Sequence, residues 1–429
     1  MTEIVSADWV LPVAGPPIRD GAVAIEDGRI AAVGPAAELG AGTRYEEAAI
    51  VPGFVNAHSH LEYAVYAGFG DGLSFGPWIL LHVERKAKLG PDEMEAIARL
   101  GAAQCLASGI TTVGDASFSG AAALACAALG LRAIVYLEVF GRGPESIAGR
   151  FAETRERIAD VLGDGVRLGI SPHAPYTCSA ELYAACLELG LPVATHFAES
   201  EAEQEWLAFG TGAWEPFADM LAEPTGETGI RHLARHGALS GSMTAAHCVI
   251  VDDDEIELLA RHDVAVAHCP RSNALLGCGI APLAALRETG ARVGLGTDSP
   301  ASAPSFDMFD EMRAAVMGAR ARERRSDVLS AADALALATR GSAQALGLED
   351  EIGSLAPGKR ADLAVVSLAG SPYLPWEEPA AAVVFGGSPD RVKTTIVEGK
   401  VRYERGVFEW HDLRKSAAEA RARMLAHTL

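Results

Sequence analysis

In the middle of the chain, short apolar runs alternate with longer segments in which apolar residues recur at helical spacing. Eight runs have this pattern: Val51–Val55, Ile110–Val113, Ala133–Leu137, Val166–Ile170, Pro192–Thr195, Met243–Ala246, Val264–Ala267 and Val293–Leu295. Strands and helices in this number predict a (β/α)₈ barrel, with a doubly wound parallel sheet as the alternative. Polar residues cluster directly after the runs, at the strand ends where such barrels place their active sites. We therefore favour the barrel.

The two ends of the chain have a different, strand-rich pattern. Near the start, Ala22–Ile25 and Ile30–Val33 flank an Asp-Gly pair at Asp27, which indicates a hairpin because glycine tolerates a positive φ. Near the end, Ala361–Val366 and Thr394–Val401 are rich in strand-forming residues and are bounded by Gly, Pro and Asp. Because both chain ends are strand-rich while the middle alternates strands and helices, we predict that the two ends meet in one small β-sandwich.

These patterns divide the chain into two expected domains. Residues 53–352 would form the barrel, and residues 1–52 and 353–429 would together form a split β-sandwich domain. The expected fold class is α/β, a TIM-like (β/α)₈ barrel with a small β-sandwich built from both chain ends. From about Asp412 the sequence is rich in Ala, Arg and Glu, which predicts a helix.

Composition narrows the classes of partner. The 429 residues include 36 basic and 57 acidic side chains, for a formal net charge of −21. This balance argues against nucleic-acid binding, because neutralising phosphates requires clustered positive charge. No apolar stretch approaches the roughly 18 residues of a membrane span, and the first residues lack a basic start and a long apolar run, so we expect no secretory signal. We expect a small-molecule substrate and no membrane partner, and leave a homo-oligomer open.

The cysteines indicate the compartment. There are seven of them, an odd number, and they are scattered without any Cys-x-x-Cys pair. This pattern is typical of reduced thiols in an intracellular protein. The expected location is therefore the cytoplasm.

Histidines and one aspartate follow the apolar runs in a pattern that indicates a metal site. His58 and His60 end the first run, and alternate residues of a strand share a face, so both can point at one ion. His196 ends the fifth run, His247 the sixth, and Asp298 follows the eighth. Strand ends of a barrel converge on one mouth, and surface histidines have no reason to choose that end. The sequence predicts a metal centre there.

The segments around these residues resemble the amidohydrolase superfamily, and within it the branch of chlorohydrolases and adenosine-type deaminases. The resemblance covers nearly the whole chain, including the split sandwich. It implies a metal-dependent hydrolase that acts on a C–N bond of a cyclic amidine, a deaminase. The segments that carry it are 52–60, 196–199, 246–248 and 296–299.

The resemblance also implies roles for individual residues. His58, His60, His196 and Asp298 would hold one divalent ion and leave a position for water. Three nitrogens and one oxygen suit zinc, our first choice, and also iron or manganese. Asp298 would in addition accept the proton of that water, and His247 would hold or polarise the attacking hydroxide.

Glu199 follows His196 by three residues. In the deaminases that this branch resembles, a glutamate at this spacing protonates the ring nitrogen of the substrate and passes a proton to the departing ammonia. The alternative is a glutamate favoured by the first turn of a helix. The spacing favours the catalytic role.

The distribution of lysine excludes one kind of centre. Many binuclear members of the superfamily bridge two metals with a carboxylated lysine on the fourth strand. Here no lysine lies between Lys88 and Lys359. Given the resemblance, a lysine-bridged binuclear centre is excluded, and the dihydroorotase, hydantoinase and phosphotriesterase types are disfavoured.

Candidate substrate contacts lie on the loops after the strands. His173 resembles a substrate-contacting histidine of nucleoside-type deaminases, and Trp78 would cover the heterocycle. Arg142 and Arg150 would meet a substrate carboxylate at the rim of the pocket. Each of the four also has an ordinary structural interpretation, as packing or surface residues. The segment 268–273 is interpreted as a loop that shapes the mouth.

The expected reaction is deamination of an adenine-type nucleoside or related purine. Residues 53–78, 196–221 and 268–279 look most like aminodeoxyfutalosine deaminases. The alternatives are a triazine-type chlorohydrolase or aminohydrolase, and a deaminase of S-adenosylhomocysteine, guanine or 8-oxoguanine. Against S-adenosylhomocysteine, the third run ends at Glu138 without the arginine that those deaminases use nearby for a carboxylate. A non-enzymatic metal-binding barrel would have no reason to carry Glu199 and His247.

Overall fold

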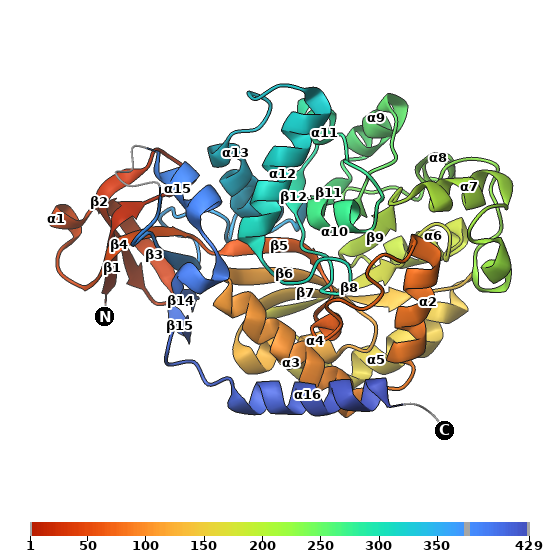
Figure 1. Cartoon of the computed structure of the whole chain (residues 1–429), viewed down its shortest axis with the longest axis horizontal. Coiled ribbons are helices and arrows are strands. Elements are labelled where there is room, and N and C mark those ends of the chain that lie inside the picture. Colours follow the sequence, from red (N-terminus) through yellow and green to blue (C-terminus); the bar gives the residue numbers. More distant parts are fainter. Residues whose placement is uncertain (1, 373–377, 427–429) are drawn as a thin grey trace.

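The computed structural model describes residues 2–372 and 378–426. Within these residues the strands form one parallel sheet of eight strands and a separate sheet of seven (Figure 1). The eight-stranded sheet follows chain order, from β5 to β12, and each strand pairs in parallel with the next. Its strands are β5 (Phe54–Ser59), β6 (Ile110–Ser117), β7 (Arg132–Val139), β8 (Val166–Pro172), β9 (Val193–Phe197), β10 (Met243–His247), β11 (Ala265–His268) and β12 (Val293–Leu295).

The ends of this sheet meet and nearly close it into a barrel. The closing contact involves two of the predicted metal ligands, because the backbone N–H of Asp298 donates to the carbonyl of His58 at 3.0 Å. Ser59 also pairs with Asp298 as an isolated bridge. The predicted (β/α)₈ barrel is confirmed. Its helices are α2 (Phe75–Lys86), α3 (Pro91–Ala107), α4 (Ala121–Leu129), α5 (Ala152–Arg157), α6 (Ala180–Glu188), α7 (Glu201–Phe209), α8 (Gly229–Arg235), α9 (Asp253–Arg261), α10 (Pro270–Leu275), α11 (Leu283–Glu288), α12 (Met308–Glu323), α13 (Ala331–Ala336) and α14 (Ser342–Ala345).

All eight predicted runs contribute to barrel strands, with one boundary to correct. The first run was expected to be a single strand over Val51–Val55, but Val51 belongs to the preceding strand, which ends at Pro52, and the barrel strand begins at Phe54. Gly53 separates the two because a side chain does not fit: a Cβ there would lie 2.2 Å from the Thr111 side chain. One extended segment therefore runs from the second sheet into the barrel and carries His58.

The second sheet combines strands from both chain ends, as expected. Its order is β15-β14-β13-β4-β1-β2-β3. The expected hairpin joins β2 and β3, with Asp27 and Gly28 both at positive φ. The run Thr394–Val401 forms two strands, because Glu398 and Gly399 make a second hairpin turn. The strands are β1 (Glu3–Val10), β2 (Ile18–Glu26), β3 (Arg29–Pro35), β4 (Thr43–Pro52), β13 (Leu363–Ser367), β14 (Val392–Val397) and β15 (Lys400–Glu404).

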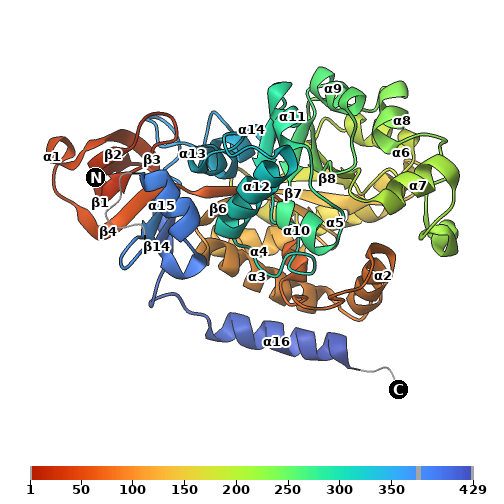
Figure 2. The same cartoon turned by 45° about the horizontal axis from the view of Figure 1, so that its top comes forward.

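The predicted last helix is α16 (His411–Leu425), and it lies along α3 of the barrel (Figure 2). Short helices α1 (Ala36–Leu39) and α15 (Pro379–Gly386) belong to the chain-end segments. The proposed division at residues 1–52, 53–352 and 353–429 stays a prediction, and residues 1, 373–377 and 427–429 of it lie outside the described residues. Among the helices that the structure describes, none combines the length and apolar character needed to cross a bilayer.

Candidate active site

Five residues singled out in the sequence come together at the carboxyl ends of the barrel strands. His58 lies in β5 and His60 follows it, His196 lies in β9, His247 ends β10, and Asp298 follows β12. All five side chains are buried. Parallel strands deliver their carboxyl ends to the same edge of a barrel, which explains why residues 240 positions apart in the sequence meet there.

The donor atoms fit a divalent ion. The Nε2 atoms of His58 and His60 lie 3.5 and 3.4 Å from Oδ1 of Asp298. The Nε2 atoms of His60 and His196 are 3.4 Å apart. Two ligands of a tetrahedral zinc ion, each about 2.0–2.1 Å from it, are about 3.3–3.4 Å apart. Nε2 of His58 is buried and has no hydrogen-bond partner in the described part of the chain, as expected of a nitrogen that awaits a metal.

Neighbouring groups orient the imidazoles. Nδ1 of His196 lies 2.7 Å from the carbonyl oxygen of His173 and must donate to it, because a carbonyl only accepts. Nδ1 of His247 donates to Oδ1 of Asn273 at 2.9 Å. In both rings Nε2 is then the nitrogen with a free lone pair, directed into the site. Burial lowers the pKa of His58 to about 4, so this imidazole is neutral and able to bind a metal at pH 7.

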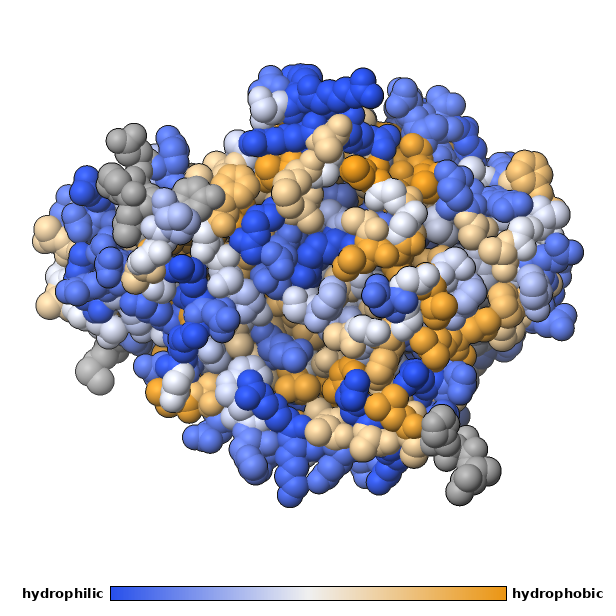
Figure 3. Space-filling model, viewed as in Figure 1, coloured by the Kyte–Doolittle hydropathy of each residue, from blue (hydrophilic) through white to orange (hydrophobic). Residues whose placement is uncertain are grey.

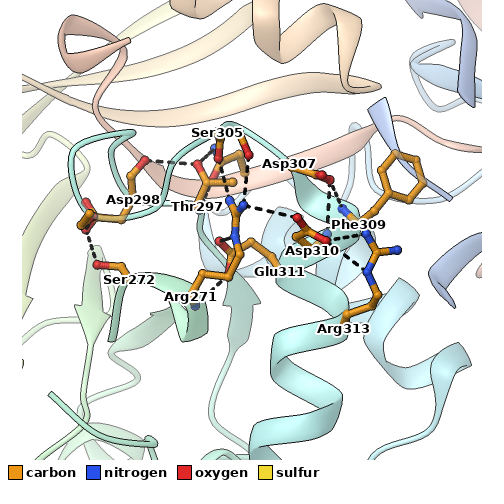
Figure 4. A network of polar contacts seen from close by, with 12 residues as sticks. Arg271, Ser272, Thr297, Asp298, Ser305, Asp307, Phe309, Asp310, Glu311 and Arg313 are labelled. Atoms are coloured by element: carbon orange, nitrogen blue, oxygen red, sulfur yellow. Dashed lines mark hydrogen bonds and ion pairs between the residues drawn. The ribbon is translucent and has the colours of Figure 1, made fainter. Parts of the chain in front are cut away.

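Asp298 is held on one side only. The hydroxyls of Ser272 and Ser302 donate to its Oδ2 at 2.7 and 2.6 Å, and Figure 4 shows the contact with Ser272. Oδ1 is left facing His58 and His60. Burial alone would raise the pKa of Asp298, but its contact with His58 and the nearby His60 and His247 keep that pKa well below its usual range. The carboxylate is therefore ionised at neutral pH.

A buried ion pair holds the segment that supplies Ser272. The guanidinium of Arg271 donates to Glu311 of α12 at 2.5 Å and to the hydroxyl of Ser305 at 3.1 Å (Figure 4). Residues 268–273 were expected to be a loop, but Pro270 begins the short helix α10. Pro is favoured in the first turn of a helix, which is why the local sequence folds this way.

Glu199 lies between β9 and α7, ahead of the helix. The cap of α7 is Ser200, whose hydroxyl accepts the N–H of Glu203 at 3.3 Å. The carboxylate of Glu203 in turn accepts the backbone N–H groups of Ala198 and Glu199, both at 2.9 Å. The helix start is thus satisfied by other residues, and the side chain of Glu199 lines the cavity. Burial, followed by the charge of Asp298, raises its pKa well above the usual range and so favours the protonated, carboxylic acid form of Glu199.

The backbone is strained where these strands end. Ala198, His247, Cys248 and Asp298 all have φ between 49° and 72°, a region that residues with a Cβ avoid. Such conformations cost on the order of 1–3 kcal/mol each and persist only where the surrounding structure enforces them. Their concentration at one mouth of the barrel marks that mouth as the functional end.

A cavity of about 250 Å³ opens over the donor atoms. Helix α2 forms one wall, and Figure 3 shows hydrophobic residues gathered on the outer surface in the region of α2, where Val83 is half exposed. Much of the lining is aromatic, as suits a planar heterocycle. The lining residues include His60, Tyr63, Trp78, His82, Lys86, Glu138, His173, Tyr176, His196, Glu199, Trp214, His247 and Asp298.

Two of the four expected substrate contacts lie in this cavity. His173 and Trp78 line it, and Nδ1 of His173 lies 2.9 Å from the hydroxyl of Thr177. Arg142 and Arg150 are not among its lining residues. The half-exposed Arg142 pairs with Glu223 at 2.8 Å, and Arg150 stacks on Phe118 with 3.3 Å between its guanidinium carbon and the ring centroid. Their roles as substrate contacts stay predictions.

Three further residues of the cavity wall were not predicted as site residues. Lys86 and Glu138 bring charge to the wall, and His82 lies beside them in the lining. Burial raises the pKa of Glu138, but Lys86 and then His60 and His173 outweigh burial and lower it, so the carboxylate is ionised. The strand-end rule that identified His196 and His247 applies equally to Glu138, near the end of β7, and would have found it.

Known sequences and structures resemble this chain over almost its entire length. A sequence model described as the amidohydrolase family matches residues 49–402. A 5-methylthioadenosine/S-adenosylhomocysteine deaminase of Symbiobacterium thermophilum is 34% identical over 418 residues, which cover 94% of this chain and 93% of the relative. A 5'-deoxyadenosine deaminase of Methanothermobacter thermautotrophicus is 32% identical over 417 residues, covering 95% and 94%.

Solved structures share the fold. An adenosine deaminase of Xanthomonas campestris with bound zinc has a TM-score of 0.88 and 28% identity, and the match covers 98% of each chain. Atrazine chlorohydrolase of Arthrobacter aurescens TC1, complexed with zinc, has a TM-score of 0.82 and 24% identity over 98% of this chain and 99% of that one. At this lower identity the second likeness shows the fold alone.

Proposed function

The chain belongs to the amidohydrolase family, and from that premise we propose that it is a metal-dependent deaminase that releases ammonia from adenine nucleosides. The observation that carries the proposal is Glu199, a buried carboxylic acid with a raised pKa in the same cavity as the histidine and aspartate donors. Relatives named as deaminases of adenine nucleosides, alike over more than nine tenths of the chain, support it.

We assign the metal to His58, His60, His196 and Asp298. The distances between their donor atoms and the unpartnered Nε2 of His58 support this set, and the zinc-bound adenosine deaminase supports zinc. A divalent ion bound there supplies Lewis acidity and lowers the pKa of a coordinated water to near 7. One ion per chain is expected, because no lysine lies between Lys88 and Lys359 and the fourth barrel strand, β8, therefore carries none to bridge two ions.

The protein's own groups handle the protons. Ammonia leaves an adenine ring only after the ring nitrogen is protonated, and Glu199 is the acid that can donate that proton. Oδ1 of Asp298 is free to accept the proton of the attacking water, because the two serine hydroxyls occupy Oδ2. Nε2 of His247 lies 3.7 Å from Oε1 of Glu199 and faces the same space, where it can orient the nucleophile.

Which adenine nucleoside is the preferred substrate can be decided by comparing the candidates in one assay. Aminodeoxyfutalosine is our first candidate, because the motifs resemble deaminases of that compound. Methylthioadenosine, S-adenosylhomocysteine and 5'-deoxyadenosine are the competitors, because relatives are named for them. All four carry an adenine on a sugar and differ at the 5' substituent, so one assay ranks them.

The test is ammonia release by the purified, zinc-loaded protein. We expect kcat/KM above about 10⁴ M⁻¹s⁻¹ for at least one of the four nucleosides, within the ordinary range for a natural substrate. Atrazine with chloride detection serves as the control for triazine chemistry. Absence of ammonia release from every adenine nucleoside, or faster chloride release from atrazine, would overturn the proposal.

A further inference from the structure

Glu138 is a buried carboxylate without a protein partner. It lies one residue before the end of β7, is 5% exposed and lines the cavity. Within the described residues its oxygens make no hydrogen bond or ion pair. They are not among the fully inaccessible unpartnered atoms, and Glu138 lines the cavity, so the oxygens face the cavity. By contrast, the buried carboxylate of Glu62 accepts the hydroxyls of Ser117 and Ser119. A carboxylate left in this state is one whose hydrogen-bond donors arrive with a ligand.

Lys86 balances the charge of Glu138 without bonding to it. Its ammonium lies 3.8 Å from the centroid of the Phe118 ring and is not within 4.0 Å of the Glu138 carboxylate. The guanidinium of Arg150 stacks on the same ring. Both cations act electrostatically on Glu138, and neither makes an ion pair or hydrogen bond with its oxygens.

The charges around Glu138 determine which kind of ligand group can donate hydrogen bonds to it. A ligand ammonium would be attracted by Glu138 but repelled by Lys86 and Arg150, which already supply positive charge. A ligand carboxylate or phosphate would be repelled by the anionic Glu138, because no proton is held there to bridge the two anions. Neutral hydroxyls avoid both penalties, and two adjacent hydroxyls match the two oxygens of one carboxylate. The geometry favours a vicinal diol.

Resting on the proposed function, we propose that Glu138 is a specificity-determining residue that binds the 2'- and 3'-hydroxyls of the nucleoside sugar. Glu138 and the catalytic groups line one cavity, so the two ends of one small molecule can reach both. With the adenine ring at Glu199, the sugar hydroxyls are the neutral donors that the rest of the nucleoside offers. The enzyme would then discriminate against nucleosides without that diol, and Lys86 keeps Glu138 ionised.

The test combines Glu138→Gln with a substrate that lacks the diol. We expect wild-type kcat/KM to be about 100-fold higher for adenosine than for 2',3'-dideoxyadenosine, because a site built for hydroxyls rejects an analogue without them. In Glu138→Gln the ratio should fall at least 10-fold, through loss on adenosine alone. Equal losses on both substrates, or a wild-type ratio near one, would overturn the assignment while leaving the deaminase proposal intact.

A binding measurement separates this assignment from the proposed reaction. Trp78 and Trp214 line the cavity, so quenching of tryptophan fluorescence reports occupancy without turnover. Wild type should bind inosine at least 10-fold more tightly than 2',3'-dideoxyinosine, and Glu138→Gln should remove that preference. If the preference holds but no nucleoside is deaminated, the proposed reaction fails and the diol site stands. If wild type shows no preference, the diol site fails.

Two further variants guard against a change in folding. Glu84→Gln neutralises an exposed carboxylate of α2 and should leave both ratios unchanged. Glu138→Asp keeps the charge but withdraws the oxygens by one methylene, and should weaken inosine binding with an unaltered thermal midpoint. A preference lost equally in Glu84→Gln would mean that net charge, and not a contact with the diol, controls binding.

Discussion

At the scale of single residues, four of the groups assigned to the reaction are each held through an atom that the chemistry does not need. His196 and His247 are fixed through Nδ1, and Asp298 through Oδ2. Glu199 is fixed through its backbone N–H, by Glu203. The reactive atoms are therefore positioned before any metal or substrate arrives, which reduces the reorganisation needed during the reaction.

Replacing Glu199 with Gln tests the acid directly. The amide is nearly the same size and cannot transfer the proton, so we expect kcat to fall about 10²–10⁴-fold. The zinc content and thermal midpoint should stay at wild-type values, because Glu199 is outside the proposed ligand set. Ammonia release and bound zinc are measured on the same preparation.

A matched control is Glu201→Gln, an exposed glutamate two residues further along the chain. It should keep full activity. Near-wild-type ammonia release from metal-loaded Glu199→Gln would contradict the proposed mechanism and leave Glu199 a packing residue.

At the scale of elements, some features are readable in the sequence and others are not. The barrel strands are buried on both faces, so each appears as a continuous apolar run, and His58 or Asp298 at its end carries recognisable chemistry. The cavity wall formed by α2 cannot be predicted from the sequence, because no sequence pattern indicates that Lys86 lines the same cavity as Glu138 of β7. Arg142 illustrates the opposite case, a residue predicted to contact substrate that does not line the cavity. The sequence does not indicate whether a loop arginine points into a pocket or, as here, pairs with Glu223.

Replacing Gly53 with Ala tests the junction between the sheets. The new methyl group would meet the buried side chain of Thr111, and β5 with its histidines would have to shift. We expect a loss of about 1–3 kcal/mol in the free energy of unfolding. Bound zinc per chain should also fall. Gly15→Ala, where a Cβ meets nothing within 4 Å, is the control and should change neither measurement.

His82 of α2 makes stability depend on pH. Burial, followed by Arg85 and Lys86, lowers its pKa to about 4, from 6.5 for the free side chain. Between pH 6.5 and 4 the unfolded chain takes up a proton that the folded chain refuses, so stability falls as pH falls through this window. Above pH 6.5 His82 has no such effect.

His82→Phe should remove part of that loss. We expect the drop in unfolding free energy from pH 7 to pH 4.5 to be smaller by on the order of 2–3 kcal/mol in the variant. Urea unfolding at the two pH values measures it. The exposed His236 supplies the control variant, His236→Ala, which should drop as much as wild type does. An unchanged drop in His82→Phe would show that His82 is protonated in the folded state.

At the scale of the whole molecule, the proposed metal donors come from three barrel strands, β5, β9 and β12, so a bound ion ties distant parts of the chain together. A ligand that binds only the folded chain stabilises it by RT ln(1 + [L]/Kd), about 4 kcal/mol at 1,000 times Kd. We expect chelation to lower the thermal midpoint and one equivalent of zinc per chain to restore it. Two tightly bound ions per chain, or a midpoint insensitive to the chelator, would contradict the assignment.

The mixed origin of the second sheet has a consequence for biosynthesis. β4 pairs on one side with β1, which leaves the ribosome before it, and on the other with β13. At about 5–20 residues per second, the roughly 310 residues between Pro52 and Leu363 take about 15–60 s to synthesise. For that time the apolar edge of β4 has no partner, and an unpaired strand edge is a template for aggregation. The yield of folded protein should therefore rise with any condition, chaperone supply above all, that protects the nascent chain during translation.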